Sequence, residues 1–139
     1  NQELIEKGQY YLVQASTGNT LSKYHLEASI AYWHTQKEDT PEKWQNILQL
    51  YNHLLFLEYS PIAALNRTFA LAKTNGKKEA IIEAEKLNLT QNPFYYSLLG
   101  NLYTDIDNKK AIENFEKALQ ITNSPADQAT IIKNINSIK

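Results

Sequence analysis

The sequence predicts an all-α protein built from repeated helix pairs, and two observations lead to that fold class. Dipeptides of a small polar residue and proline recur 32 residues apart, as Ser60-Pro61, Asn92-Pro93 and Ser124-Pro125. The polar side chain can accept a hydrogen bond from a free amide of the first helical turn, and proline at the first helical position lacks the N–H that would stay unpaired. Apolar triads at offsets of 0, 4 and 7 residues follow a similar period, so each triad lies on one helix face. These triads are Ile47/Tyr51/Leu54, Ala80/Ala84/Leu87 and Ala111/Phe115/Ala118.

About eight helices are expected in order along the chain. The first covers residues 2–15, with an apolar stripe of Leu4, Ile5, Tyr11 and Leu12. Apolar residues surround the axis of the second, 21–36, which predicts burial on most sides. Asp39-Thr40-Pro41 supplies a cap and a proline start for the third, 41–58. The other five are expected at 61–74, 77–88, 93–105, 108–121 and 125–138. The last should turn Ile131, Ile132, Ile135 and Ile138 to one side, as a terminal repeat does.

The length and layout of the repeated unit are those of the tetratricopeptide class, in which about 34 residues form a helix–turn–helix. The best local match runs from Tyr96 to Leu119 and places Gly100 where two helices cross closely and Phe115 between helices. The turn before Ala111 is one residue shorter than the usual pattern. The prediction is a right-handed α-α superhelix of degenerate tetratricopeptide-like helix pairs. Residues 1–139 would form a single domain, with one helix pair over 1–40 and three repeat-like pairs over 41–139.

Composition narrows the functional class. The chain has 139 residues, with 14 basic and 15 acidic side chains and a net charge of −1. A nucleic-acid-binding domain normally shows a basic stripe, whereas Arg67 is the one arginine here. No apolar run approaches the length of a membrane span, and the absence of cysteine removes disulfide and thiolate chemistry. Since the sequence contains no methionine, we expect its true N-terminus to be missing and the chain to be a piece of a longer polypeptide.

Catalytic and metal-binding patterns are weak. His34 and Glu38 have the i,i+4 spacing that could hold a metal, but no second ligand pair of the kind zinc requires accompanies them. No glycine-rich phosphate loop, G-x-S-x-G element or cysteine nucleophile is present. We therefore predict a protein that is not an enzyme and uses no cofactor and no metal.

Two segments carry more polar groups than a plain repeat needs. The helix at 21–36 contains Tyr24, His25, Glu27 and His34, and the helix at 61–74 contains Asn66 and Arg67. Buried polar groups must be paired, so these six residues are either an internal network or the lining of a groove that receives a partner segment. Both interpretations remain open on the sequence.

The same segments resemble a known family. KYHLEASIAYWHTQ is similar to the PYQLQAAIAAxHA stretch of bacterial extracytoplasmic-function (ECF) sigma factors that carry a C-terminal tetratricopeptide-like extension. The segment EDTPEKWQNILQLYNHLLFL and the segment SPIAALNRTFALAKTNGKKEAI resemble the two stretches that follow in that family, and Leu4-Ile5-x-x-Gly8 resembles its entry. Trp44 is shifted by one residue, and lysine and asparagine stand on surfaces where relatives carry alanine and arginine. Residues on the family pattern are Tyr24, Leu26, Ala28, Ile30, Ala31, His34, Trp44, Tyr51, Pro61, Ala64, Leu65, Asn66 and Arg67.

This resemblance implies a regulatory protein-interaction domain of a cytoplasmic sigma factor. Its partners would be the protein's own sigma domains, RNA polymerase, or a regulatory protein or peptide. DNA would be contacted only through N-terminal domains that precede residue 1, and no membrane would be involved. The alternative is a free-standing tetratricopeptide scaffold or adaptor.

Overall fold

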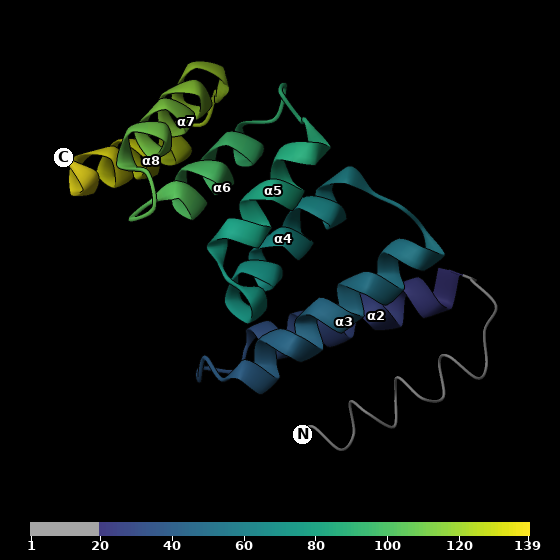
Figure 1. Cartoon of the computed structure of the whole chain (residues 1–139). Coiled ribbons are helices and arrows are strands. Elements are labelled where there is room, and N and C mark those ends of the chain that lie inside the picture. Colours follow the sequence, from purple (N-terminus) through teal and green to yellow (C-terminus); the bar gives the residue numbers. More distant parts are fainter. Residues whose placement is uncertain (1–19) are drawn as a thin grey trace. The chain divides into compact units, whose positions relative to one another are not determined.

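The computed structural model describes residues 20–139, and over that range the chain forms seven α-helices and no β-strand (Figure 1). The all-α fold class is therefore confirmed for these residues. Each of the seven helices begins and ends within two residues of its predicted position, while the predicted helix 2–15 lies outside the described residues. The helices are α2 (Thr20–His34), α3 (Pro41–Leu57), α4 (Pro61–Asn75), α5 (Lys77–Leu87), α6 (Pro93–Tyr103), α7 (Asn108–Ile121) and α8 (Pro125–Ile138).

Capping side chains define the helix starts, as predicted. Ser60, Asn92 and Ser124 each accept a hydrogen bond from a backbone amide of the helix that follows, at 3.3, 2.8 and 3.3 Å. Thr40 and Asp107 do the same ahead of α3 and α7. A side-chain cap of this kind contributes about 1 kcal/mol, so these boundaries depend on local sequence.

The chain divides after Thr74 into two compact units. The described part of the first contains α2, α3 and nearly all of α4. The second, from Asn75 onward, contains α5 to α8. Gly76, next to the division, has a φ of 104°, a conformation that L side chains rarely adopt. The predicted assignment of one helix pair to 1–40 and three pairs to 41–139 stays a prediction.

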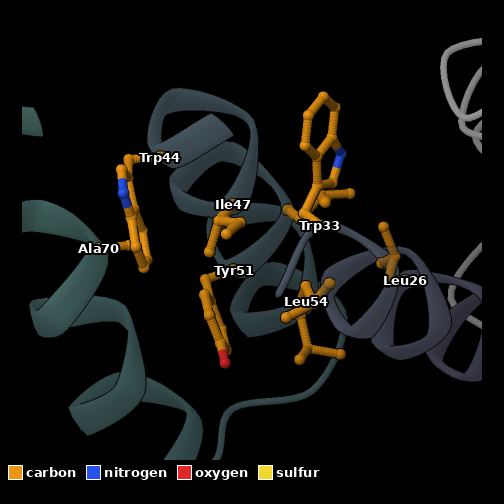
Figure 2. Close-up of a cluster of buried hydrophobic side chains, with 9 residues drawn as sticks. Leu26, Trp33, Trp44, Ile47, Tyr51, Leu54 and Ala70 are labelled. Carbon is orange, nitrogen blue, oxygen red and sulfur yellow. The ribbon is translucent and has the colours of Figure 1, made fainter. Parts of the chain in front are cut away.

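The core of the first unit lies mainly between α2 and α3, with Ala70 of α4 added to it (Figure 2). Three residues of α2 at i, i+4 and i+7 enter this core, and α3 contributes five. The predicted triad of α3 is buried, with Ile47 fully covered. The buried members are Leu26, Ile30, Trp33, Trp44, Ile47, Leu50, Tyr51, Leu54 and Ala70.

The expectation that α2 is buried on most sides is wrong. Tyr24 is 69% exposed, and Ala28 and Ala31 are exposed as well. Only the i, i+4, i+7 series Leu26, Ile30 and Trp33 makes a continuous core-facing line, because that spacing repeats on one side of a helix. Alanine and tyrosine tolerate water, so their presence around the axis was weaker evidence for burial.

In the second unit α6 packs against α5 and α7, and α7 packs against α8. The predicted triad of α7 is buried, since Ala111 and Ala118 are fully covered and Phe115 is 1% exposed. Phe115 and Ala118 form a cluster with Ile131 and Ile135 of α8. The predicted face of α8 needs one correction, because Ile132 is 45% exposed.

Close packing of α6 on α7 depends on Gly100. A Cβ atom added at this position would lie 2.7 Å from the Cδ1 and Cε1 atoms of Phe115, well inside van der Waals contact. Gly100 itself is buried. The predicted roles of Gly100 and Phe115 are thereby confirmed: the missing side chain of one makes room for the ring of the other.

Within the described residues, no helix has both the length and the apolarity needed to span a bilayer.

Candidate functional site

Arg67 of α4 is half-buried and connects its helix to α3. Its Nε–H donates a hydrogen bond to Oδ1 of Asn52 at 2.5 Å. No carboxylate of residues 20–139 lies within ion-pair distance of the guanidinium. A guanidinium has five N–H donors, so this bond leaves most of them available to a ligand or to water.

The other predicted site residues make no hydrogen bond or ion pair with Arg67 within residues 20–139. Tyr24, His25 and Glu27 are exposed on α2, and Asn66 is half-buried beside Arg67 in the sequence. No hydrogen bond, ion pair or ring contact within residues 20–139 joins any two of the six. The structure thus does not bring the two polar segments together into one pairing network.

His34, the last residue of α2, packs against Trp44 instead. The two rings meet edge to face, with centroids 5.9 Å apart. Burial, followed by the nearby positive charge of Lys43, lowers the pKa of His34 below its usual 6.5. His34 is nevertheless an exposed residue outside the buried cluster, so its imidazole contacts Trp44 from the surface.

Trp44 organises a cluster that connects α3, α4 and the segment between α2 and α3. Its indole N–H donates to Oδ1 of Asp39 at 3.2 Å, and its ring meets Phe69 of α4 with centroids 5.4 Å apart. The ammonium groups of Lys43 and Lys73 lie 5.0 and 5.6 Å from the Trp44 ring centroid. Cations at this distance from an indole are attracted by the negative face of the ring.

Lys43 is buried, which is unusual for lysine. Its ammonium donates to the carbonyl of Gln36 at 2.7 Å and lies 3.6 Å from Asp39. The second carboxylate oxygen of Asp39 lies 3.9 Å from Lys73. One exposed aspartate therefore holds two lysines and one tryptophan, an arrangement suited to fixing the α2–α3 connection against α4. Sequence reasoning found Trp44 and the cap at Thr40 but missed this cluster, although the i,i+4 spacing of Asp39 and Lys43 was a visible signal.

Catalytic groupings are not evident in the described part of the chain. No group of three or more His, Cys, Asp and Glu among residues 20–139 could hold a metal ion. The Tyr103 hydroxyl donates to Glu85 at 2.9 Å. Burial, helped by this bond and by the Glu85 charge, raises the pKa of Tyr103 to about 12. The hydrogen bond from Tyr103 to Glu85 ties α6 to α5.

Exposed apolar side chains gather near the connection between α3 and α4. Phe56 is 89% exposed, Tyr59 is 64% exposed and Ile62 is 48% exposed. Sequence reasoning passed over Phe56, which lies outside the Ile47/Tyr51/Leu54 face of α3. Exposed aromatic residues are characteristic of surfaces that bind other proteins.

No family model matches the chain, and no solved structure matches it significantly. An uncharacterized protein of Rhizobium meliloti (strain 1021) is 31% identical over 113 residues, which cover 78% of this chain and 26% of that protein. The chain therefore spans about a quarter of the length of the curated relative that it matches.

Proposed function

We propose that this chain is a regulatory protein-interaction domain of an ECF-type sigma factor and acts in transcription initiation. In this proposal the helix pairs form a right-handed tetratricopeptide-like superhelix of about eight helices, counting one at 2–15. The domain would work in the cytoplasm and would need neither cofactor nor metal.

The proposal rests on where the structure places the residues that match the sigma-factor-like pattern. Leu26, Ile30, Tyr51 and Leu65 of that pattern are buried, as core positions should be. Arg67 also belongs to the pattern, yet it is half-buried and has no acidic partner in residues 20–139. Because packing in the core does not account for Arg67, its presence in the pattern supports a role in binding.

The electrostatics support a protein partner over DNA. With a net charge of −1 and one arginine in the whole sequence, the domain can neutralise few phosphates. Counterion release, which dominates binding to DNA, scales with the number of phosphates contacted. DNA contacts would belong to sigma domains outside this sequence, and the partners of this domain would be those sigma domains, RNA polymerase, or a regulatory protein or peptide.

The length of the relative favours a domain of a larger protein over a free-standing scaffold. Similarity extends over most of this chain but over only 26% of the other protein. A repeat domain of this kind offers a surface formed in advance, so a partner segment binds without the domain first having to order itself.

Transcription in vitro by the protein expressed with its upstream coding region tests the proposal. The region upstream of Asn1 should contain a helical pair followed by a helix-turn-helix, and promoter-dependent transcription should change markedly when residues 1–139 are deleted. The isolated domain should give no sequence-specific shift of promoter DNA at physiological salt. An upstream region without sigma domains, or a persistent shift with the isolated domain, contradicts the proposal.

A further inference from the structure

The outward side of α3 has an unusual composition. Gln45, Gln49, Asn52 and Phe56 are separated by 4, 3 and 4 residues, so they share one face of the helix, and all four are exposed. The first three are amides that can donate and accept hydrogen bonds. Phe56 completes this face and is 89% exposed, the largest value among the exposed large apolar residues of the described chain.

Arg67 reaches this face from α4 through its bond to Asn52. Asn52 and Phe56 are neighbours at i and i+4, one helical turn apart. Asn52 therefore neighbours both the guanidinium of Arg67 and, one helical turn along α3, the exposed Phe56. Arg67 is half-buried as a residue and lacks an acidic partner among residues 20–139. Because Asn52 holds its Nε–H, an incoming carboxylate would meet a cation that is already oriented.

We propose that Asn52, Phe56 and Arg67 form a docking face, the Arg67 face, for a protein segment that presents an acidic side chain close to an apolar one. The carboxylate would bind the free N–H groups of Arg67 in a bidentate manner, and the apolar side chain would cover Phe56. The segment belongs to the remainder of the same polypeptide, an identification that rests on the proposed function.

The face as defined has one aromatic anchor, Phe56, which fits a segment better than a second copy of the chain. A stable dimer interface buries about 800 Å² on each partner, whereas one aromatic anchor supplies roughly 150–250 Å². Charge favours an acidic segment as well, because the cation at the centre of the face would repel a basic one. An acidic-plus-apolar segment uses both features of the face at once.

Site-specific photo-cross-linking in the full-length protein tests this inference. A benzophenone-bearing phenylalanine analogue replaces Phe56, and in a matched control it replaces Phe94, which is 45% exposed at the start of α6. We expect a cross-link from position 56 to an upstream peptide that contains Asp or Glu, with a yield at least about fivefold above that from position 94. Equal yields, a cross-link to a second copy of the chain, or one to a basic or uncharged peptide overturns the inference.

Two substitutions test the chemistry in the same assay. Arg67→Ala should reduce the cross-link at position 56 by about tenfold or more, and Arg67→Lys should reduce it less, because lysine keeps the charge without the bidentate geometry. Thermal unfolding of each variant shows whether the fold is retained. If the Arg67→Ala variant unfolds, Phe56→Ser still gives a test, because it alters an exposed side chain. Phe56→Ser should weaken the binding of residues 1–139 to the separately expressed upstream region at least about fivefold.

The outcomes separate this inference from the proposed function. Residues 1–139 could bind upstream sigma domains equally well with and without the Arg67→Lys and Phe56→Ser substitutions. That result overturns the Arg67 face and leaves the proposed function standing. An upstream region without sigma domains overturns the proposed function, whereas a cross-link from position 56 to an acidic segment of that region would still support the face.

Discussion

Substituting Gly100 with alanine tests the close contact of α6 with Phe115 of α7. The added methyl group would lie 2.7 Å from the Phe115 ring, and this ring is 1% exposed and therefore has little room to move. Overpacking of this kind costs about 1–3 kcal/mol. Alanine also favours the helix over glycine by about 1 kcal/mol, so Gly100→Ala should destabilise the chain by about 0–2 kcal/mol.

The second substitution, Phe115→Ala, removes the ring and leaves a cavity, at a cost of about 3–5 kcal/mol. In this background the methyl group at position 100 no longer meets the ring. Gly100→Ala should therefore become stabilising by about 1 kcal/mol through helix propensity alone. The double-mutant cycle then gives a coupling of about 1–3 kcal/mol between the two positions.

Urea unfolding of residues 1–139 followed by circular dichroism measures all four free energies. The sign change of the Gly100→Ala effect between the two backgrounds is the decisive result. If Gly100→Ala shifts stability equally with and without the Phe115 ring, the ring does not occupy the space beside Gly100. A loss below about 1 kcal/mol for Phe115→Ala would show that the side chain is not buried, and the helix register of α7 would be wrong.

Three further predictions concern the polar contacts. Asp39→Asn keeps an acceptor for Trp44 but removes the charge next to Lys43, and it should cost about 0.5–1 kcal/mol of stability because Asp39 is exposed. Asp39→Ala also removes the acceptor and should cost about 1–2 kcal/mol. Equal losses of the two variants in urea unfolding would argue against the indole bond. Burial and then Lys43 lower the pKa of His34, so just below pH 6.5 the unfolded chain binds more protons than the folded one. The stability present above that pH should therefore fall as the pH decreases. His34→Gln should flatten the dependence of stability on pH between pH 7 and 5, whereas an unchanged dependence would exclude His34 as its source. Burial and then Glu85 raise the pKa of Tyr103 from 10.0 to about 12, so stability should be lost as the pH rises from 10 to 12. Tyr103→Phe should remove the latest step of the ultraviolet tyrosinate titration. A titration curve that keeps this step assigns it to another tyrosine.

Helix starts could be predicted because their causes lie within four residues of sequence. The Asn92-Pro93 and Ser124-Pro125 pairs carry both the cap and the rigid φ angle of the first turn. The register of α7 was equally accessible, because an apolar series at i, i+4 and i+7 identifies one helix face without knowledge of its partner.

Contacts between helices were harder to anticipate, because they depend on which faces meet. The bond between Asn52 and Arg67 connects positions 15 residues apart on different helices, and no local pattern indicates it. For Phe56 the reason differs. An aromatic residue in an apolar run is normally assigned to the core, although the Ile47/Tyr51/Leu54 register already placed Phe56 away from the buried face of α3.

The most extensive packing in both units occurs between helices that follow each other in the chain: α2 with α3, α5 with α6, α6 with α7 and α7 with α8. Such a chain has low contact order, and chains of low contact order fold rapidly because little loop-closure entropy is lost before contacts form. During synthesis α3 can pack on α2, and α6, α7 and α8 can each pack on the helix before them, soon after they leave the ribosome and without waiting for a distant segment.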